Sequence, residues 1–169
     1  MAPDNTLIRA ILFDWGDTLM HDDPAQPGPM AQWPTVSALP GAREALQWAR
    51  AIGPVCIASG ASESDSADIR AALARVNLDH CIDRIFCRRE LGTNKTDPRF
   101  WAAICEALAM PAQQIVMIGD SYESDVLAAQ AAGLHAVWFN WRGLPPRPCP
   151  TVAALRELPQ IITGNLLKS

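Results

Sequence analysis

The sequence predicts an α/β fold, namely a three-layer α/β/α sandwich around a mainly parallel, Rossmann-like sheet. Short runs rich in β-branched and aliphatic residues alternate along the chain with segments of helical periodicity. Such alternation is typical of βαβ units, whose right-handed crossovers place helices on both faces of a parallel sheet. At 169 residues the chain can bury a sizeable core, and we expect a single domain over residues 1–169.

Five segments have the composition of strands, and four helical patterns lie between them. We expect strands at residues 7–13, 54–58, 84–87, 114–119 and 135–140, and helices at 41–52, 62–76, 97–110 and 124–133. Ser62 and Asp65 have the spacing of a capping box at the start of the second helix. Asp97 is expected to cap the third helix, with Pro98 in its first turn, and Gly133 to end the fourth.

Two proline-rich segments interrupt this alternation. Residues 20–41 show no convincing periodicity, which predicts a long irregular loop. Residues 141–150 form a second proline-rich loop, and a short terminal helix is expected over residues 151–158. Trp33 and Trp141 lie in these two loops and are candidates to line a binding crevice.

The composition restricts the class of protein. The net charge of −4 argues against nucleic acid or an anionic membrane as the main partner. No apolar run approaches the roughly 20 residues that span a bilayer, and the first residues lack the pattern of a signal peptide. The five cysteines are an odd number without C-x-x-C spacing, which indicates reduced thiols in a cytoplasmic protein rather than a zinc or disulfide site.

Polar side chains are expected at the ends of three strands. Asp14 ends the first predicted strand, Ser59 follows the second, and Asp120 follows the fourth. In open parallel sheets, ligands bind beyond the carboxyl ends of the strands, so these residues should converge on one crevice. Lys95 is a further candidate because the chain has only one other lysine, Lys168 in the tail.

Four motifs, "FDWGDTL", "IASGAS", "NKTDP" and "GDSYESD", occur in this order along the chain. The set resembles the haloacid dehalogenase superfamily, roughly over residues 8–143. Most members are Mg²⁺-dependent phosphohydrolases that work through an aspartyl-phosphate. The resemblance therefore implies a hydrolase that uses Mg²⁺ and acts on a phosphorylated substrate.

The resemblance also implies a role for each motif. Asp14 would be the nucleophile, and Ser59 with the backbone N–H groups after it would hold a phosphoryl oxygen at a strand-to-helix turn. Lys95 would supply positive charge to the phosphate and the transition state. Asp120 would bind Mg²⁺ together with Asp14, and Asp125 would touch the ion or orient Lys95.

The first motif departs from the usual phosphatase form, D-x-D-G-T. In that form, the second aspartate lies two positions after the nucleophile and acts as the general acid and base. Here that position is Gly16, and the acid is Asp17, one position later, where glycine is usual. The Gly16 carbonyl could still ligate Mg²⁺, and Asp17 could serve as a displaced acid if the turn rotates it inward. Loss of a general acid/base typically costs roughly 10²- to 10⁴-fold in rate.

The segments between the motifs are too short for a cap domain, so the resemblance is to a capless member. An open crevice requires a larger substrate or a second copy of the chain in a homodimer to cover it, or small phosphates will turn over slowly. An alternative is a catalytically weak protein that binds phosphorylated ligands or a partner. A third is a phosphonatase-like hydrolase, because phosphonoacetaldehyde hydrolase shares the tryptophan and a small residue in the first motif. That enzyme needs a cap-domain lysine, however, and no lysine precedes Lys95.

Overall fold

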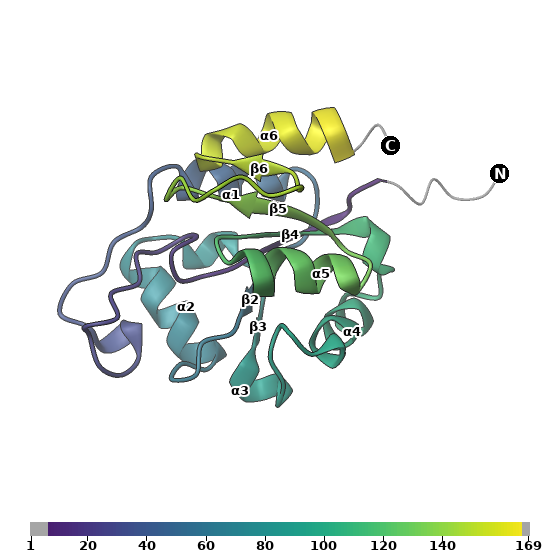
Figure 1. The fold of residues 1–169 in the computed structure, drawn as a ribbon. Coiled ribbons are helices and arrows are strands. Elements are labelled where there is room, and N and C mark those ends of the chain that lie inside the picture. Colours follow the sequence, from purple (N-terminus) through teal and green to yellow (C-terminus); the bar gives the residue numbers. More distant parts are fainter. Residues whose placement is uncertain (1–6, 167–169) are drawn as a thin grey trace.

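A computed structural model of the chain describes residues 7–166, so Lys168 lies outside the described residues. Its centre is a sheet of six parallel strands in the order β3-β2-β1-β4-β5-β6 (Figure 1). This arrangement confirms the predicted α/β fold. The strands are β1 (Ala10–Phe13), β2 (Val55–Ser59), β3 (Arg84–Cys87), β4 (Ile115–Gly119), β5 (His135–Phe139) and β6 (Thr151–Val152).

Helices cover both faces of the sheet, which explains why the central strands are apolar throughout. Side chains of β1 alternate between two hydrophobic clusters: Ile11 and Phe13 belong to one, and Ala10 and Leu12 to the other. The first cluster is completed by α1 (Ala42–Arg50), α2 (Ser66–Arg75) and α6 (Leu158–Ile161), and the second by α4 (Pro98–Leu108) and α5 (Ala128–Ala131). A single-turn helix, α3 (Arg88–Leu91), follows β3.

The structure corrects two predictions about local structure. The second helix begins at Ser66 rather than near Ser62, and its capping box consists of Asp65 and Asp68. Asp65 accepts a hydrogen bond from the Asp68 N–H, and Asp68 accepts one from the Asp65 N–H. The expected helix over residues 151–158 begins instead as β6, because the N–H of Trp138 donates to the Pro150 carbonyl and that of Asn140 donates to the Val152 carbonyl. The helical structure follows at Leu155–Glu157 and α6.

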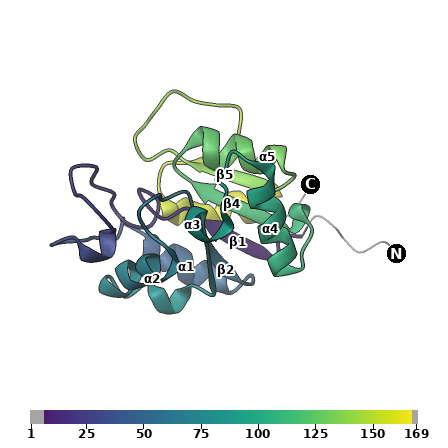
Figure 2. The ribbon, with the colours of Figure 1, turned by 90° about the horizontal axis from the view of Figure 1, so that it is seen from below.

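The long loop after β1 is irregular as predicted, but its two ends pair with each other. We call residues 16–39 the flap. Met20 forms an antiparallel bridge with Ala38, and the N–H of His21 donates to the carbonyl of Ser37. The flap and the loop 141–150 both extend from the end of the sheet at which the strands terminate (Figure 2). Within residues 7–166 no cap domain is present, and no helix is long and apolar enough to cross a bilayer.

Candidate active site

Three carboxylates meet beyond the carboxyl ends of the two central strands. Asp14 follows β1 and Asp120 follows β4; the N–H of Asp14 donates to the carbonyl of Ile118 at 2.8 Å, which joins the two strands at this point. Asp125 comes from the helical turn after β4. One oxygen from each carboxylate lies within 4.8 Å of the other two. Asp14 and Asp120, two of the three strand-end residues that the sequence placed in one crevice, are therefore brought together, and Asp125 joins them.

Lys95 binds two of these carboxylates. Its Nζ donates to Asp14 Oδ1 and to Asp125 Oδ1, both at 2.7 Å, and the side chain is only 4% exposed. Burial alone would lower the pKa of Lys95, but the charges of Asp125 and Asp14 outweigh it and raise this pKa above its usual value. Lys95 is therefore a permanent positive charge beside Asp14.

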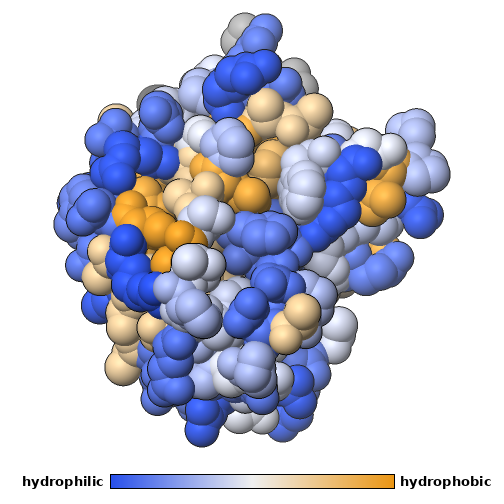
Figure 3. Space-filling model, turned by 90° about the vertical axis from the view of Figure 1, so that its left-hand side faces the viewer, coloured by the Kyte–Doolittle hydropathy of each residue, from blue (hydrophilic) through white to orange (hydrophobic). Residues whose placement is uncertain are grey.

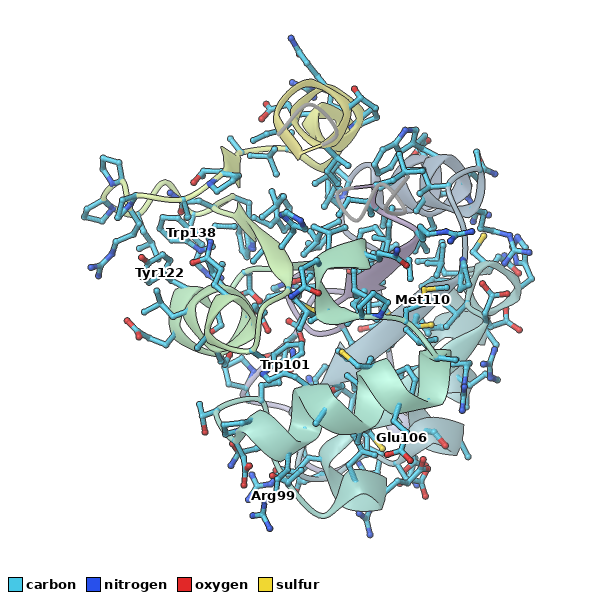
Figure 4. The ribbon with its side chains drawn as sticks, turned by 90° about the vertical axis from the view of Figure 1, so that its right-hand side faces the viewer. Arg99, Trp101, Glu106, Met110, Tyr122 and Trp138 are labelled. Atoms are coloured by element: carbon cyan, nitrogen blue, oxygen red, sulfur yellow. The ribbon has the colours of Figure 1, made fainter. Side chains whose placement is uncertain are left out.

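The helix after Lys95 fixes its backbone. Asp97 caps α4 and Pro98 is its first residue, both as predicted. The indole of Trp101, buried in the core, then donates from Nε1 to the Lys95 carbonyl at 2.7 Å. In Figure 4, Trp101 extends from α4 into the interior, whereas Arg99 and Glu106 on the same helix point away from the sheet.

Asp120 is held by groups from three parts of the chain. Thr18 Oγ1 lies 3.2 Å from Asp14 Oδ2 and 3.3 Å from Asp120 Oδ1, and it accepts a hydrogen bond from the Asp120 N–H. Arg142 donates to Asp120 Oδ2 at 2.7 Å. Trp138 donates to the Asp120 carbonyl and packs edge-on against Tyr122, as Figure 4 shows.

The crowding of carboxylates raises two of their pKa values. Burial and the charge of Asp14 raise the pKa of Asp120 to about 7, although Arg142 opposes the shift. Burial and the charge of Asp14 also raise the pKa of Asp125 to about 6, opposed by Lys95. A group of hard oxygen donors with unfavourable mutual repulsion is the chemistry that suits a divalent cation such as Mg²⁺.

Asp125 depends on a glycine at the end of β4. A Cβ atom on Gly119 would lie 2.1 Å from Asp125 Oδ2, so any other residue there would displace this carboxylate. The same oxygen accepts a hydrogen bond from the Ser121 N–H at 3.0 Å. Asp125 is buried and contacts Lys95 directly, which fits the predicted role of orienting that lysine.

Ser59 lies at the end of β2, as predicted, and is buried. Its Oγ accepts a hydrogen bond from the Ala61 N–H at 3.1 Å. The expected strand-to-helix turn is longer than a direct turn, because residues 60–65 intervene before α2 begins at Ser66. These intervening residues contribute the backbone next to Ser59.

Asp17 does not join the three carboxylates. It has a φ of 58°, in the left-handed region that glycine ordinarily occupies and that aspartate tolerates better than most residues. Its Oδ2 accepts a hydrogen bond from Arg142 at 2.6 Å, and its Oδ1 accepts one from the Asp22 N–H at 3.0 Å. Trp141 donates to the Asp17 carbonyl and stacks under the Arg142 guanidinium, 4.2 Å from ring centroid to Cζ.

A cleft of about 620 Å³ opens beside the cluster. Figure 3 views this end of the molecule, where hydrophobic residues gather beside hydrophilic ones around a hollow. Trp33 of the flap lines the cleft, whereas Trp141 and Asp17 are not among the lining residues. The lining also includes Asp14, Gly16, Asp22, Ser59, Lys95 and Asp125.

Sequence reasoning missed three side chains at this site: Thr18, Asp22 and Arg142. Thr18 belongs to the first motif itself, so its place in D-x-x-x-T was a usable signal. Arg142 follows β5. The rule that ligands bind beyond the carboxyl ends of parallel strands would have identified it, as it identified Asp14, Ser59 and Asp120. Asp22 gave no signal in the sequence, because its position depends on the path of the flap. Although Asp22 is exposed, partial desolvation and the charges of Asp17 and Asp14 raise its pKa.

Comparison with known proteins agrees with this geometry. A family model described as "Hydrolase: haloacid dehalogenase-like hydrolase" matches residues 29–133. Phosphoserine phosphatase from Thermus thermophilus is 36% identical over 95 residues, which cover 53% of this chain and 37% of that protein. Phosphoglycolate phosphatase from Pseudomonas fluorescens is 30% identical over 128 residues, 75% of this chain and 44% of that protein. The chain thus spans less than half the length of these two relatives.

Solved structures support the fold. The crystal structure of an uncharacterized protein from Listeria monocytogenes serotype 4b superposes with a TM-score of 0.82 at 23% identity, and the match covers 92% of this chain and 97% of that one. A phosphatase structure from Thermococcus onnurineus gives a TM-score of 0.76 at 18% identity, covering 94% and 100% of the two chains. At these identities, the likeness concerns the fold alone.

Proposed function

We propose that this chain, which belongs to the haloacid dehalogenase-like hydrolase family, is a Mg²⁺-dependent phosphohydrolase that works through an aspartyl-phosphate on Asp14. The observation that carries the proposal is the position of Lys95, whose ammonium bridges Asp14 and Asp125 at 2.7 Å in a buried setting. A buried lysine on a carboxylate that also faces a cleft is suited to bring a phosphate dianion to that carboxylate.

In this proposal, Asp14 attacks phosphorus and splits one difficult transfer into two easier ones. Lys95 stays charged throughout and offsets the negative charge that develops on the phosphoryl oxygens. Asp125 and the Trp101 indole keep Lys95 in place. Ser59 Oγ, at the rim of the same cleft, would donate to a phosphoryl oxygen.

The cation would be held by Asp14, Asp120, Asp125 and the Gly16 carbonyl. Bound there, Mg²⁺ would neutralise the repulsion between the carboxylates and the phosphate. Three carboxylates with oxygens within 4.8 Å, two of them with raised pKa values, fit this role.

The substrate is proposed only as a class. The relatives named above are phosphatases of small phosphate monoesters by their names, and they are longer than this chain. We therefore infer a phosphate monoester as the substrate.

A second candidate function is the binding of phosphorylated ligands with little turnover. The presence of Gly16, in place of an acid, favours this candidate because the usual proton donor is missing. In that case the cluster would hold phosphate and cation without hydrolysis.

The test is a panel of phosphate monoesters assayed with Mg²⁺, with wild type compared with Asp14→Asn. We expect Asp14→Asn to lower turnover by more than about 10³-fold, because the nucleophile is lost. The matched control is Glu106→Gln, an exposed site on α4, which should retain wild-type turnover. Removal of Mg²⁺ with a chelator should also abolish turnover. Phosphate binding without turnover of any substrate would contradict the phosphohydrolase and support the second candidate.

A further inference from the structure

We propose that Asp22 is the general acid and base of this site, in place of the acid missing at Gly16. The inference rests on the proposed phosphohydrolase function. It concerns a residue in the flap, six positions beyond Gly16, which the sequence motif does not include.

The position of the Asp22 carboxylate is the main argument. If Gly16 carried a Cβ atom, its three nearest neighbours would all belong to Asp22: Oδ2 at 3.3 Å, Cβ at 3.4 Å and Cγ at 3.5 Å. The Asp22 side chain therefore occupies the space beside Gly16 into which a side chain at that position would project. The Asp22 carboxylate therefore lies close to where the Cβ atom of an acidic residue at position 16 would lie.

The conformation and hydrogen bonds of Asp17 fix the position of Asp22 in the flap. The left-handed conformation of Asp17 turns the chain, and its N–H donates to the Met20 carbonyl at 2.6 Å. Asp17 Oδ1 then accepts a hydrogen bond from the Asp22 N–H, while Oδ2 is held by Arg142. Asp17 is thus a positioning residue that fixes the backbone of Asp22.

Asp17 and Asp22 differ in the hydrogen bonds that their carboxylates accept and in whether they line the cleft. Both oxygens of Asp17 are engaged, and Asp17 does not line the cleft. Asp22 lines the cleft together with Asp14, and within residues 7–166 no N–H or O–H group donates a hydrogen bond to its carboxylate. Asp22 is therefore free to give and take a proton, whereas Asp17 is not.

The proposed steps balance as follows. An Asp14 oxygen forms a bond to phosphorus as the bond from phosphorus to the ester oxygen breaks, and protonated Asp22 gives its proton to that oxygen so that an alcohol leaves. Ionised Asp22 then takes a proton from water, whose oxygen attacks phosphorus. The bond from phosphorus to Asp14 breaks, which releases inorganic phosphate and restores the Asp14 carboxylate and the protonated Asp22.

The experiment compares Asp22→Asn with wild type on two phosphate monoesters. On β-glycerophosphate, whose alkoxide is a poor leaving group, we expect turnover to fall roughly 10²- to 10⁴-fold. On p-nitrophenyl phosphate, whose leaving group needs no proton, rapid mixing should show a burst of p-nitrophenolate near one equivalent, followed by slow turnover as phosphorylated Asp14 accumulates. The control is Glu106→Gln, an exposed carboxylate on α4 away from the cleft, and it should behave as wild type.

A relocation variant separates catalysis from structure. The double variant Gly16→Asp with Asp22→Ala moves the acid to position 16, two residues after Asp14. Its turnover should be at least tenfold higher than that of Asp22→Ala alone. Gly16 does not have a positive φ, so the backbone tolerates the change.

Three outcomes would overturn the inference. One is Asp22→Asn with β-glycerophosphate turnover within twofold of wild type. Another is equal loss on both substrates with no burst, and the last is no recovery in the relocated variant. Retained turnover in Asp14→Asn would instead refute the aspartyl-phosphate, and a wild-type protein without any turnover would refute both proposals.

Discussion

At the scale of single residues, the site combines three clustered carboxylates with the cationic side chains of Lys95 and Arg142. Asp14, Asp120 and Asp125 are close enough for their oxygens to share one ion, and Lys95 and Arg142 each bind two acids of the region. The ammonium of Lys95 neutralises the inner side of the cluster, whereas Arg142 reaches it from the loop 141–150. Asp120, which Arg142 binds, has a pKa raised to about 7 by burial and by the charge of Asp14.

This raised pKa leads to a prediction about stability and pH. The folded pKa of Asp120 lies above its ordinary value of 3.8, so the folded protein holds a proton that the unfolded chain releases. The resulting contribution to the free energy of unfolding is complete below about pH 4 and is lost as the pH rises through about 7. Without divalent cations, wild-type protein should therefore lose more stability between pH 5 and pH 8 than Asp120→Asn does, by on the order of 1–3 kcal/mol.

Thermal unfolding at several pH values checks this prediction, with Glu106→Gln as the matched control for the removal of one negative charge. Mg²⁺ should restore the stability of wild type at pH 8 and leave Asp120→Asn less affected, because a bound cation relieves the same repulsion. Parallel pH profiles of wild type and Asp120→Asn would contradict the assignment of this effect to Asp120.

At the scale of elements, the ends of β1, β2, β4 and β5 each deliver one part of the site, and the segments that follow fix it. The helical turn Tyr122–Leu127 after β4 is wound as a π-helix and carries Asp125 back toward Gly119. The segment after β1 is the flap, whose ends pair at Met20 and Ala38. The segment after β2 is the loop 60–65, which ends in the capping box of α2.

The capping box gives a prediction at this scale. Asp65→Ala removes the acceptor for the Asp68 N–H and should lower the melting temperature by a few degrees. Ser62→Ala is the control: it should leave the melting temperature unchanged, because the helix does not begin there. Calorimetry or circular dichroism measures both variants. Equal destabilisation by the two substitutions would show that the cap is assigned to the wrong residue.

At the scale of the whole molecule, the site lies in a cleft that no cap domain covers within residues 7–166. The flap borders the cleft on one side, and Trp33 is buried in the flap and donates from Nε1 to the Gly28 carbonyl. Cap domains ordinarily exclude water and select small substrates. Selection by size is therefore expected to be weak here.

A comparison of substrates of different size tests this expectation. For a glycolate-sized monoester and for a nucleoside monophosphate, kcat/KM should agree within about tenfold, because nothing above the cleft rejects the larger group. Steady-state kinetics with wild type are sufficient. A preference of several hundredfold for the smaller monoester would contradict the open cleft.

The sequence by itself determined the fold class, the strand ends and the motifs. Alternating patterns specify βαβ units, and parallel strands bring their carboxyl ends to one edge, so Asp14, Ser59 and Asp120 could be placed together without coordinates. Lys95 was identified by its rarity and its motif.

Only the tertiary structure decided which groups these residues contact. The engagement of Asp17 by Arg142, and the approach of Asp22 to Gly16, join segments whose relative position no local pattern encodes. The same applies to β6, a two-residue strand specified by pairing with β5 rather than by its own composition. Local periodicity fixes elements, whereas long-range packing fixes the path of irregular loops, and the proton donor of this site lies in such a loop.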